Sequence, residues 1–292
     1  MSFAGTHTAL VTPFLNGTFD APAFQALIEK QIAGEVEGIV PVGTTGESPT
    51  LDHDEHNEVI LAAITAARGR CKVIAGTGSN STAEAITLTT EAEKMGADAA
   101  LLVAPYYNKP SQEGLYRHFR AIAEAVKFPI ILYSIPGRCG VEIGVETVVR
   151  LAEDTTNVVA IKEAGGTVER VNQLRHALPD SFEILSGDDS LTLPFLSAGA
   201  VGVISVASNV VPKEVSDYVR AWLQGRTEVA AKGHRRLYPL FKDLFIEPNP
   251  VPAKHALCVQ RICSPEVRLP LCEMSEANRF KLEATLASLG LL

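Results

Sequence analysis

Eight short apolar runs recur along the chain, and each is followed by a longer segment with helical spacing of its apolar residues. The runs are rich in Val, Ile, Leu and Ala almost throughout, as expected for parallel strands that are buried on both faces. They lie at Thr8–Phe14, Gly38–Gly43, Lys72–Gly78, Ala99–Pro105, Pro129–Pro136, Val158–Glu163, Glu183–Asp188 and Gly202–Ser208. This repeat restricts the chain to folds built around a parallel β-sheet.

The segments between the runs carry apolar residues three and four positions apart, which predicts amphipathic helices. Ser81 stands three residues before Glu84, a capping-box spacing, and Gly96 follows the same helix where a terminal glycine is favoured. The predicted helices are Ala21–Ala33, Asp54–Arg68, Thr82–Met95, Glu113–Val126, Val145–Glu153 and Val168–Ala177. The residues after the eighth run also have a helical pattern, interrupted by prolines.

Eight strand–helix alternations predict a closed (β/α)8 TIM barrel over residues 1–225, with a C-terminal helical extension over residues 226–292. The structural alternative is an open, doubly wound sheet. That fold usually has a glycine-rich phosphate loop after its first strand, and residues 12–17 do not form one. We therefore expect one barrel with an appendage.

Composition excludes several classes of protein. The chain has 292 residues, 46% hydrophobic and 21% charged, with a net charge of −8. No Lys/Arg run points to nucleic acid, and no apolar stretch is long enough to predict a membrane span. The N-terminus lacks the pattern of a signal peptide. With five widely spread cysteines, these features predict a cytoplasmic protein with reduced thiols.

Polar residues close several of the apolar runs, where a barrel of this kind has its active site. The second run ends in Gly43-Thr44-Thr45-Gly46-Glu47-Ser48. Glycines let a ligand approach the backbone, and consecutive N–H groups with threonine hydroxyls can cradle an anion. The alternative is an ordinary glycine-rich turn capped by threonine, and the motif alone does not decide between them.

The seventh run ends in Ser186-Gly187-Asp188-Asp189, and two adjacent acids suggest a divalent metal. A metal site of this type needs further converging carboxylates, and the sequence offers no convincing set. The cysteines and histidines show no zinc spacing either. We expect no metal, and Asp189 is equally suited to cap the following helix.

The fifth run ends at Tyr133, and Arg138 follows it closely. A tyrosine at a strand end either fills the barrel, with its hydroxyl in water, or relays protons. An arginine in such a loop is usually solvated but can also clamp a carboxylate with two hydrogen bonds. Either residue alone is weak evidence for a site.

Lys162 is the stronger signal, because it lies near the end of the apolar run Val158–Glu163. Burial of an unpaired ammonium is costly, so this side chain needs a partner or a function. Desolvation lowers the pKa of a lysine and favours the neutral amine, which condenses with a ketone to form an imine. The alternative is that Lys162 pairs with Glu163 or extends from the rim into water.

Four motifs together resemble the dihydrodipicolinate synthase family of pyruvate-dependent class I aldolases. They occur in the family's order, and the resemblance covers essentially the whole chain. The motifs are Gly43-Thr44-Thr45-Gly46-Glu47, Tyr133 with Pro136-Gly137-Arg138, Val159-Ala160-Ile161-Lys162-Glu163 and Leu185-Ser186-Gly187-Asp188. The first and third are shared with the wider family of pyruvate aldolases, so they indicate the superfamily and not the substrate.

The resemblance implies a specific reaction that needs no cofactor. Pyruvate would form a covalent imine with Lys162 and lose a methyl proton to give an enamine. The enamine would attack the aldehyde of L-aspartate 4-semialdehyde, and ring closure would release 4-hydroxy-tetrahydrodipicolinate. The product stands at the branch leading to diaminopimelate and lysine.

The resemblance also implies residue roles. Tyr133 would be the general acid/base, and Thr44 would link it to Tyr107 of a neighbouring subunit in a homo-oligomer, in this family commonly a tetramer of two tight dimers. The remaining pocket residues would be Thr45 and Thr44 for the pyruvate carboxylate, Arg138 for the carboxylate of the aldehyde, and Gly187 and Ile204 for the pocket wall.

Arg138 distinguishes this chain from relatives such as N-acetylneuraminate lyase, which share the lysine and the threonine loop but lack the arginine. Another pyruvate aldolase, acting on a keto sugar acid or an N-acetylated sugar, is the alternative enzyme. A barrel that binds a keto acid as a regulator without turnover is the alternative outside enzymes. Ser134 and Cys139 depart from the commonest family residues, which leaves fine substrate preference open.

The same resemblance suggests a regulatory site for L-lysine, which inhibits sensitive family members. Carboxylate and amide oxygens could accept from its ammonium groups, and the histidines and tyrosine could bond the rest. The residues are Ser48, His53, His56, Asn80, Glu84 and Tyr106. The alternative is that both histidines are simply exposed residues at a helix start.

Overall fold

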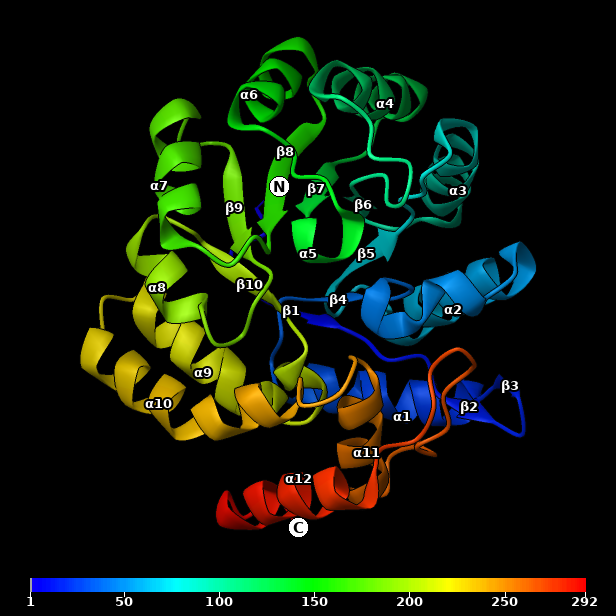
Figure 1. The fold of residues 1–292 in the computed structure, drawn as a ribbon, viewed down its shortest axis with the longest axis vertical. Coiled ribbons are helices and arrows are strands. Elements are labelled where there is room, and N and C mark those ends of the chain that lie inside the picture. Colours follow the sequence, from blue (N-terminus) through cyan, green and yellow to red (C-terminus); the bar gives the residue numbers. More distant parts are fainter. Residues whose placement is uncertain (1) are drawn as a thin grey trace.

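The computed structural model describes residues 2–292 and contains a closed barrel of eight parallel strands (Figure 1). Its order is β1-β10-β9-β8-β7-β6-β5-β4, and β4 pairs back onto β1. The strands are β1 (Gly5–Ala9), β4 (Gly38–Val40), β5 (Lys72–Gly76), β6 (Ala99–Val103), β7 (Ile130–Ser134), β8 (Val158–Glu163), β9 (Glu183–Ser186) and β10 (Gly202–Ser205). The predicted TIM barrel is confirmed.

Helices surround the barrel, and the six predicted ones are present with bounds within one residue of the prediction. Ser81 accepts from the Glu84 N–H, and Gly96 ends the same helix with φ 95°. The helices are α1 (Ala21–Ala33), α2 (His53–Ala67), α3 (Thr82–Met95), α4 (Gln112–Ala125), α5 (Pro136–Cys139), α6 (Val145–Asp154), α7 (Val168–Ala177), α8 (Thr192–Ser197) and α9 (Pro212–Leu223). None of the helices between residues 2 and 292 has the length and apolar character needed to cross a membrane.

The first strand is where the sequence interpretation was wrong. The predicted strand was Thr8–Phe14, whereas β1 spans Gly5–Ala9. Its polar side chains are buried, and the Thr8 hydroxyl is satisfied because Thr8 Oγ1 donates to Gln31 Oε1 at 2.8 Å. Phe14 instead opens a small hairpin of β2 (Phe14–Leu15) and β3 (Thr18–Phe19). Several other predicted runs extended past their strands into the loops at the barrel mouth.

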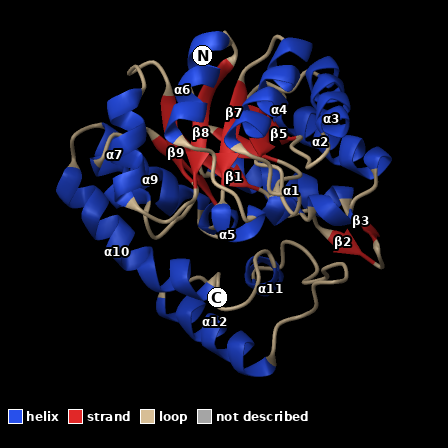
Figure 2. Ribbon diagram, turned by 45° about the horizontal axis from the view of Figure 1, so that its top comes forward, coloured by secondary structure: helices blue, strands red, loops and turns tan. Residues whose placement is uncertain are grey.

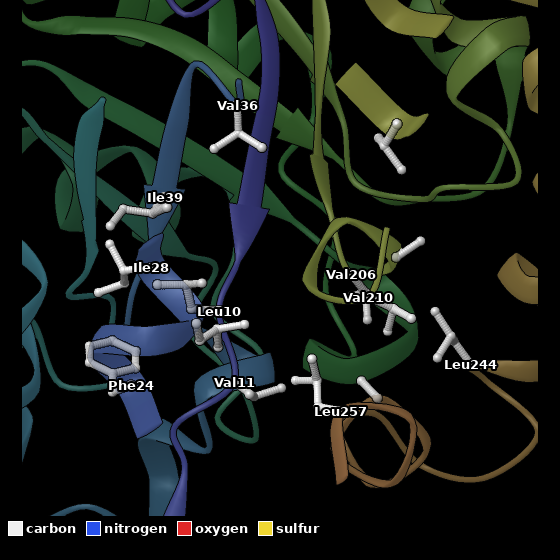
Figure 3. Close-up of a cluster of buried hydrophobic side chains, with 14 of the residues drawn as sticks. Leu10, Val11, Phe24, Ile28, Val36, Ile39, Val206, Val210, Leu244 and Leu257 are labelled. Carbon is white, nitrogen blue, oxygen red and sulfur yellow. The ribbon is translucent and has the colours of Figure 1, made fainter. Parts of the chain in front are cut away.

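The C-terminal extension comprises α10 (Thr227–Asp243), α11 (Val251–Val259) and α12 (Glu276–Ser288). Figure 2 shows these helices outside the ring that encloses the strands. Leu244 and Leu257 belong to the same apolar cluster as Leu10, Val206 and Val210 of the barrel (Figure 3). The predicted boundary at 225/226 falls between α9 and α10, and the extension shares a hydrophobic core with the barrel across it.

Candidate active site

Lys162 lies at the carboxyl end of β8 and points into the barrel. The strand pairing places it beside Tyr133 of β7, and its Nζ is 4.0 Å from the centre of the Tyr133 ring. Lys162 is only 6% exposed. The barrel interior around the pair is filled by apolar side chains such as Ile131, Leu185 and Ile204, and Leu185 is the strand partner of Lys162 on β9. The lysine therefore closes an apolar column at the mouth.

Glu163, the next residue, faces the opposite side of β8. Its carboxylate is fully buried, accepts from Gly165 N at 2.6 Å and pairs with Arg170 Nε at 3.4 Å. The pairing of Lys162 with Glu163, which the sequence left open, does not occur. Among residues 2–292, no carboxylate oxygen lies within 4.0 Å of Lys162 Nζ.

The pKa of Lys162 is lowered to about 7, chiefly by burial and in smaller part by the nearby charge of Arg138. The carboxylate of Asp189 acts in the opposite direction and raises it. An ordinary lysine is almost wholly protonated at neutral pH, because its pKa is about 10.4. The environment of Lys162 therefore leaves a large fraction of its side chain as the neutral, nucleophilic amine.

Asp189 is not the cap of the following helix. It is buried and accepts from Ser205 Oγ at 2.5 Å and from the backbone N–H groups of Val206 and Ala207 at 3.0 and 2.9 Å. Asp188 takes the local role instead, since its carboxylate accepts from Ser190 N at 2.7 Å before α8. Burial raises the pKa of Asp189 to about 6, so it carries negative charge near neutral pH.

Tyr133 is the second buried polar group at the mouth. Desolvation outweighs the opposing effects of the Arg138 charge and the Thr44 side chain, so the pKa of its phenol is raised to about 12. The phenol thus keeps its proton at neutral pH and can both donate and accept. Arg138 is exposed and belongs to α5, the short helix that Figure 1 shows over the centre of the barrel.

The threonine loop, residues 43–50, follows β4 and begins with a short 3-10 helix at Thr44–Gly46. Thr45 is buried. The backbone N–H groups of Thr44 and Thr45 donate to no acceptor among the described residues, so both are free to bind an anion. Thr44 and Tyr133 line one cavity together. The loop therefore has the geometry of an anion cradle next to Tyr133.

Gly187 and Ile204 are the two predicted residues of the pocket wall. A Cβ at Gly187 would lie 3.1 Å from Lys162 Cε and 2.7 Å from Ala164 Cβ, so this position has no room for a side chain. Ile204 is buried among the apolar side chains that fill the barrel interior. Gly187 therefore lies against the Lys162 side chain, and Ile204 lies in the same barrel interior.

Tyr107, also a predicted site residue, does not lie with Thr44 and Tyr133 in the barrel mouth. It is 90% exposed, and its backbone has a positive φ of 72°, which is uncommon for a bulky residue. It does not line the cavity that Thr44 and Tyr133 share. Within a single chain, its ring is presented to solvent.

The predicted regulatory residues come together in a second cavity of about 150 Å³. Five of the six line it, namely Ser48, His53, His56, Glu84 and Tyr106. Asn80 lies at its edge and donates to the Tyr106 carbonyl at 3.2 Å.

The alternative that both histidines of this cavity are exposed residues at a helix start holds for only one of them. His56 is buried, with Nε2 3.0 Å from the Gly76 carbonyl, whereas His53 is exposed and bonds Glu84 at 2.8 Å. Hydrogen bonds from Ser79 and then His53 lower the pKa of Glu84, so its carboxylate is charged. Ser48 and Gly76 also line the cavity at Tyr133, so the two cavities share a wall.

No group of three or more His, Cys, Asp or Glu side chains within residues 2–292 is arranged to hold a metal ion. The five cysteines are unpaired. The adjacent acids of the seventh run, Asp188 and Asp189, bind the backbone and hydroxyl donors already described.

Sequence reasoning missed two residues of the extension that contact the threonine loop. Asn249 Nδ2 donates to Thr45 Oγ1 at 3.0 Å, and Lys254 Nζ lies 2.5 Å from Glu47 Oε1. A signal for Lys254 was present, since it interrupts the largely apolar segment Val251–Val259, as Lys162 interrupts β8. Asn249 had no comparable signal, because only the fold brings it to Thr45.

A TIM barrel whose mouth carries a buried lysine of lowered pKa, a buried tyrosine and an anion cradle has the arrangement of a class I aldolase. The sequence model of the dihydrodipicolinate synthetase (DHDPS) family matches residues 2–289. The chain belongs to this family and is an enzyme of the lyase class.

Solved structures of high similarity agree with this assignment. The 4-hydroxy-tetrahydrodipicolinate synthase of Methylacidiphilum fumariolicum SolV is 57% identical, with a TM-score of 0.98 over 99% of this chain and 96% of its own. A dihydrodipicolinate synthase of Acinetobacter baumannii, complexed with pyruvate, is 44% identical with a TM-score of 0.97 and full coverage of both chains (100% each). A DHDPS of Cyanidioschyzon merolae with lysine bound is 42% identical, with a TM-score of 0.96 and 99% coverage of both chains.

Proposed function

We propose that the chain is a 4-hydroxy-tetrahydrodipicolinate synthase that condenses pyruvate with L-aspartate 4-semialdehyde. The observation that carries the proposal is the buried amine of Lys162, with no carboxylate within 4.0 Å and the Tyr133 ring 4.0 Å away. The names of the similar proteins support the reaction, and the pyruvate complex of the Acinetobacter relative supports the first substrate.

In the proposed reaction, the neutral amine of Lys162 attacks the pyruvate ketone and releases water to form an imine. Tyr133 transfers the protons of this step, because its buried phenol is protonated and adjacent. The donors of Thr44 and Thr45 hold the pyruvate carboxylate. The iminium withdraws electrons, so a methyl proton leaves and an enamine forms without any cofactor.

The enamine carbon then attacks the aldehyde of the second substrate, and that substrate's amino group displaces Lys162 as the ring closes. Arg138 at the mouth binds the carboxylate of this substrate. A cationic group at this place suits a short, carboxylate-bearing aldehyde better than a neutral sugar. This is why we favour aspartate semialdehyde over the substrates of other pyruvate aldolases.

A coupled assay tests the proposal directly. The protein should consume pyruvate in the presence of L-aspartate 4-semialdehyde, and borohydride should trap pyruvate on Lys162 as a mass increase. Cleavage of N-acetylneuraminate or a keto sugar acid, with no condensation, would assign another aldolase activity. No trapped pyruvate and no turnover would leave only a keto-acid-binding barrel.

We propose that Tyr107 completes the site of a second copy of the chain in a homo-oligomer, with a tetramer of two dimers as the expected state. A large aromatic ring held 90% exposed on a left-handed backbone is poorly explained by its own chain. In the partner, its phenol would extend the proton relay through Thr44 to Tyr133.

The rate of imine formation should depend on pH through Lys162. The neutral amine is the reactive form and its pKa is about 7, so below this pH the rate should fall about tenfold per unit. Above about pH 8 the dependence on this group should level off. Rapid-quench borohydride trapping with saturating pyruvate between pH 5 and 9 measures the profile.

The variant Asp189→Asn provides the internal check for this profile. The carboxylate of Asp189 raises the pKa of Lys162, so removal of this charge should move the midpoint of the pH–rate profile to lower pH. A profile of the wild type with its midpoint near the ordinary lysine value would contradict the assignment of Lys162.

We propose that L-lysine binds the second cavity and inhibits the enzyme. The charged carboxylate of Glu84 would accept from a ligand ammonium, and the lysine-bound Cyanidioschyzon relative supports this ligand. Millimolar L-lysine should reduce turnover, and Glu84→Gln should raise the half-inhibiting concentration about tenfold. The matched control is Glu91→Gln, since Glu91 lies on the same helix but bonds Asn57. Activity unchanged by millimolar L-lysine would refute the site.

A further inference from the structure

The C-terminal extension contacts the threonine loop through side chains that have no part in the reaction proposed above. Asn249 precedes α11, is buried, and donates from Nδ2 to Thr45 Oγ1 at 3.0 Å across a sequence separation of 204 residues. Lys254, within α11, places Nζ 2.5 Å from Glu47 Oε1. Two consecutive parts of the loop thus have their partners in the extension.

The Asn249 contact bears directly on how Thr45 can bind a ligand. A threonine hydroxyl has one hydrogen to donate and two lone pairs to accept. Because the Asn249 amide donates to Oγ1, it occupies one lone pair and leaves the hydroxyl hydrogen free. The contact therefore orients Thr45 as a donor, which is the role that an anionic carboxylate requires.

The Lys254–Glu47 pair is shielded from water, with the two residues 0% and 2% exposed. Lys254 Nζ also donates to the Glu266 carbonyl at 2.7 Å and lies 4.1 Å from the centre of the Phe14 ring. Glu47 Oε2 accepts from the backbone N–H of Arg268 at 3.0 Å. Because both side chains are buried, loss of either one would leave the other as a buried, uncompensated charge.

The C-terminal extension also binds the far end of the threonine loop, through Arg268. The Arg268 guanidinium donates to the Thr50 carbonyl at 2.8 Å and to both carboxylate oxygens of Glu55 at 2.6 and 2.7 Å. Glu47 itself adopts a left-handed backbone with φ 54°, which side-chain-bearing residues rarely adopt. Such a conformation persists where the surroundings enforce it, and here the extension supplies these surroundings.

We infer that Asn249 and Lys254 are positioning residues, by which the C-terminal extension holds the donors of Thr44 and Thr45 where the keto-acid carboxylate binds. The inference rests on the proposed function, because that function assigns the carboxylate to this loop. It assigns the extension a part in substrate binding, in addition to its packing against the barrel. Neither residue touches the reacting atoms.

Three variants test the inference. Asn249→Ala removes the contact to Thr45, Lys254→Met breaks the buried pair, and Glu47→Gln combined with Lys254→Met removes both charges. The control is Lys30→Met, because Lys30 on α1 donates to Gln260 Oε1 of the extension at 2.5 Å and to the Val210 carbonyl of the barrel at 2.9 Å, and makes no bond to the threonine loop. Steady-state kinetics, thermal unfolding and hydrogen–deuterium exchange are measured on all of them.

Asn249→Ala should raise the KM for pyruvate about tenfold, the value of one hydrogen bond, and change kcat by less than about threefold. Lys254→Met should lower Tm, and the added Glu47→Gln should restore Tm because no unpaired charge stays buried. The KM for pyruvate should stay raised in the double variant. Recovery of KM together with Tm would show a structural role only and would overturn the inference.

Hydrogen–deuterium exchange tests the same inference without turnover and without ligand. The amides of Gly46, Glu47 and Ser48, which donate to carbonyls within the loop, should exchange about tenfold faster in Asn249→Ala and in the double variant than in the wild type or Lys30→Met. Unchanged exchange in Asn249→Ala would overturn the inference, even if Lys254→Met fails to fold. A wild type that traps no pyruvate would instead refute the proposed function, while exchange still decides whether the extension holds the loop.

Discussion

Lys162→Ala should abolish the trapping of pyruvate by borohydride and lower kcat/KM by roughly 10⁴-fold or more. The imine step requires a neutral amine, and Lys162 supplies one because burial lowers its pKa to about 7. Alanine leaves no nucleophile at the end of the apolar column. The coupled assay with pyruvate and L-aspartate 4-semialdehyde measures the loss, and mass spectrometry after borohydride measures the imine.

The variant should remain folded, because it removes an amine whose charged form is costly to bury. Circular dichroism and thermal unfolding check this point. Lys213→Ala is the matched control, since Lys213 is exposed on α9 and pairs with Asp217 at 3.0 Å. A folded Lys162→Ala with the activity of the control would refute the imine mechanism.

Tyr133→Phe should lower kcat by about 10²- to 10³-fold while the protein still binds pyruvate. The substitution removes the phenolic hydroxyl and keeps the ring that lies 4.0 Å from Lys162 Nζ. Burial raises the pKa of this phenol to about 12, so the wild-type group holds a proton throughout the neutral range. Single-turnover trapping should show a slower imine step, and steady-state assays should show the loss in kcat.

Tyr116→Phe is the control for loss of a tyrosine hydroxyl. Tyr116 lies on α4 and donates to Asp154 at 2.6 Å, outside the barrel. Its replacement should leave turnover nearly unchanged. If Tyr133→Phe kept more than half of the wild-type kcat, proton transfer would have to run through another group, and the role of Tyr133 would be refuted.

Much of the fold was predictable because its signals are local. Short apolar runs that predict strands, and apolar residues three or four positions apart that predict helices, are patterns of residues near one another in the chain. Ser81 and Gly96 mark the ends of a helix by their own chemistry. The bounds of the first strand were predicted wrongly for a physical reason. Thr8 is buried with its hydroxyl satisfied by Gln31, a partner that a sequence window cannot see.

Lys162 could be predicted because one charge within an apolar strand is a local anomaly. The sequence could not predict which side chain, if any, pairs with the Lys162 amine. Whether Glu163 pairs with Lys162 or with Arg170 depends on which face of β8 each side chain occupies and on what packs there. The same limit applied to Asp189, whose partners are on β10 and in the loop after it, 16 to 18 residues along the chain.

The sequence by itself determined the eight-strand repeat, the lysine at the end of a barrel strand and the motifs that mark the family. Only the tertiary structure decided the pKa of Lys162, the orientation of Thr45 by Asn249 and the enclosure of Glu47 by Lys254. The physical reason is that desolvation and Coulomb interactions sum over atoms that are close in space. Here those atoms come from strands and from an extension more than two hundred residues away.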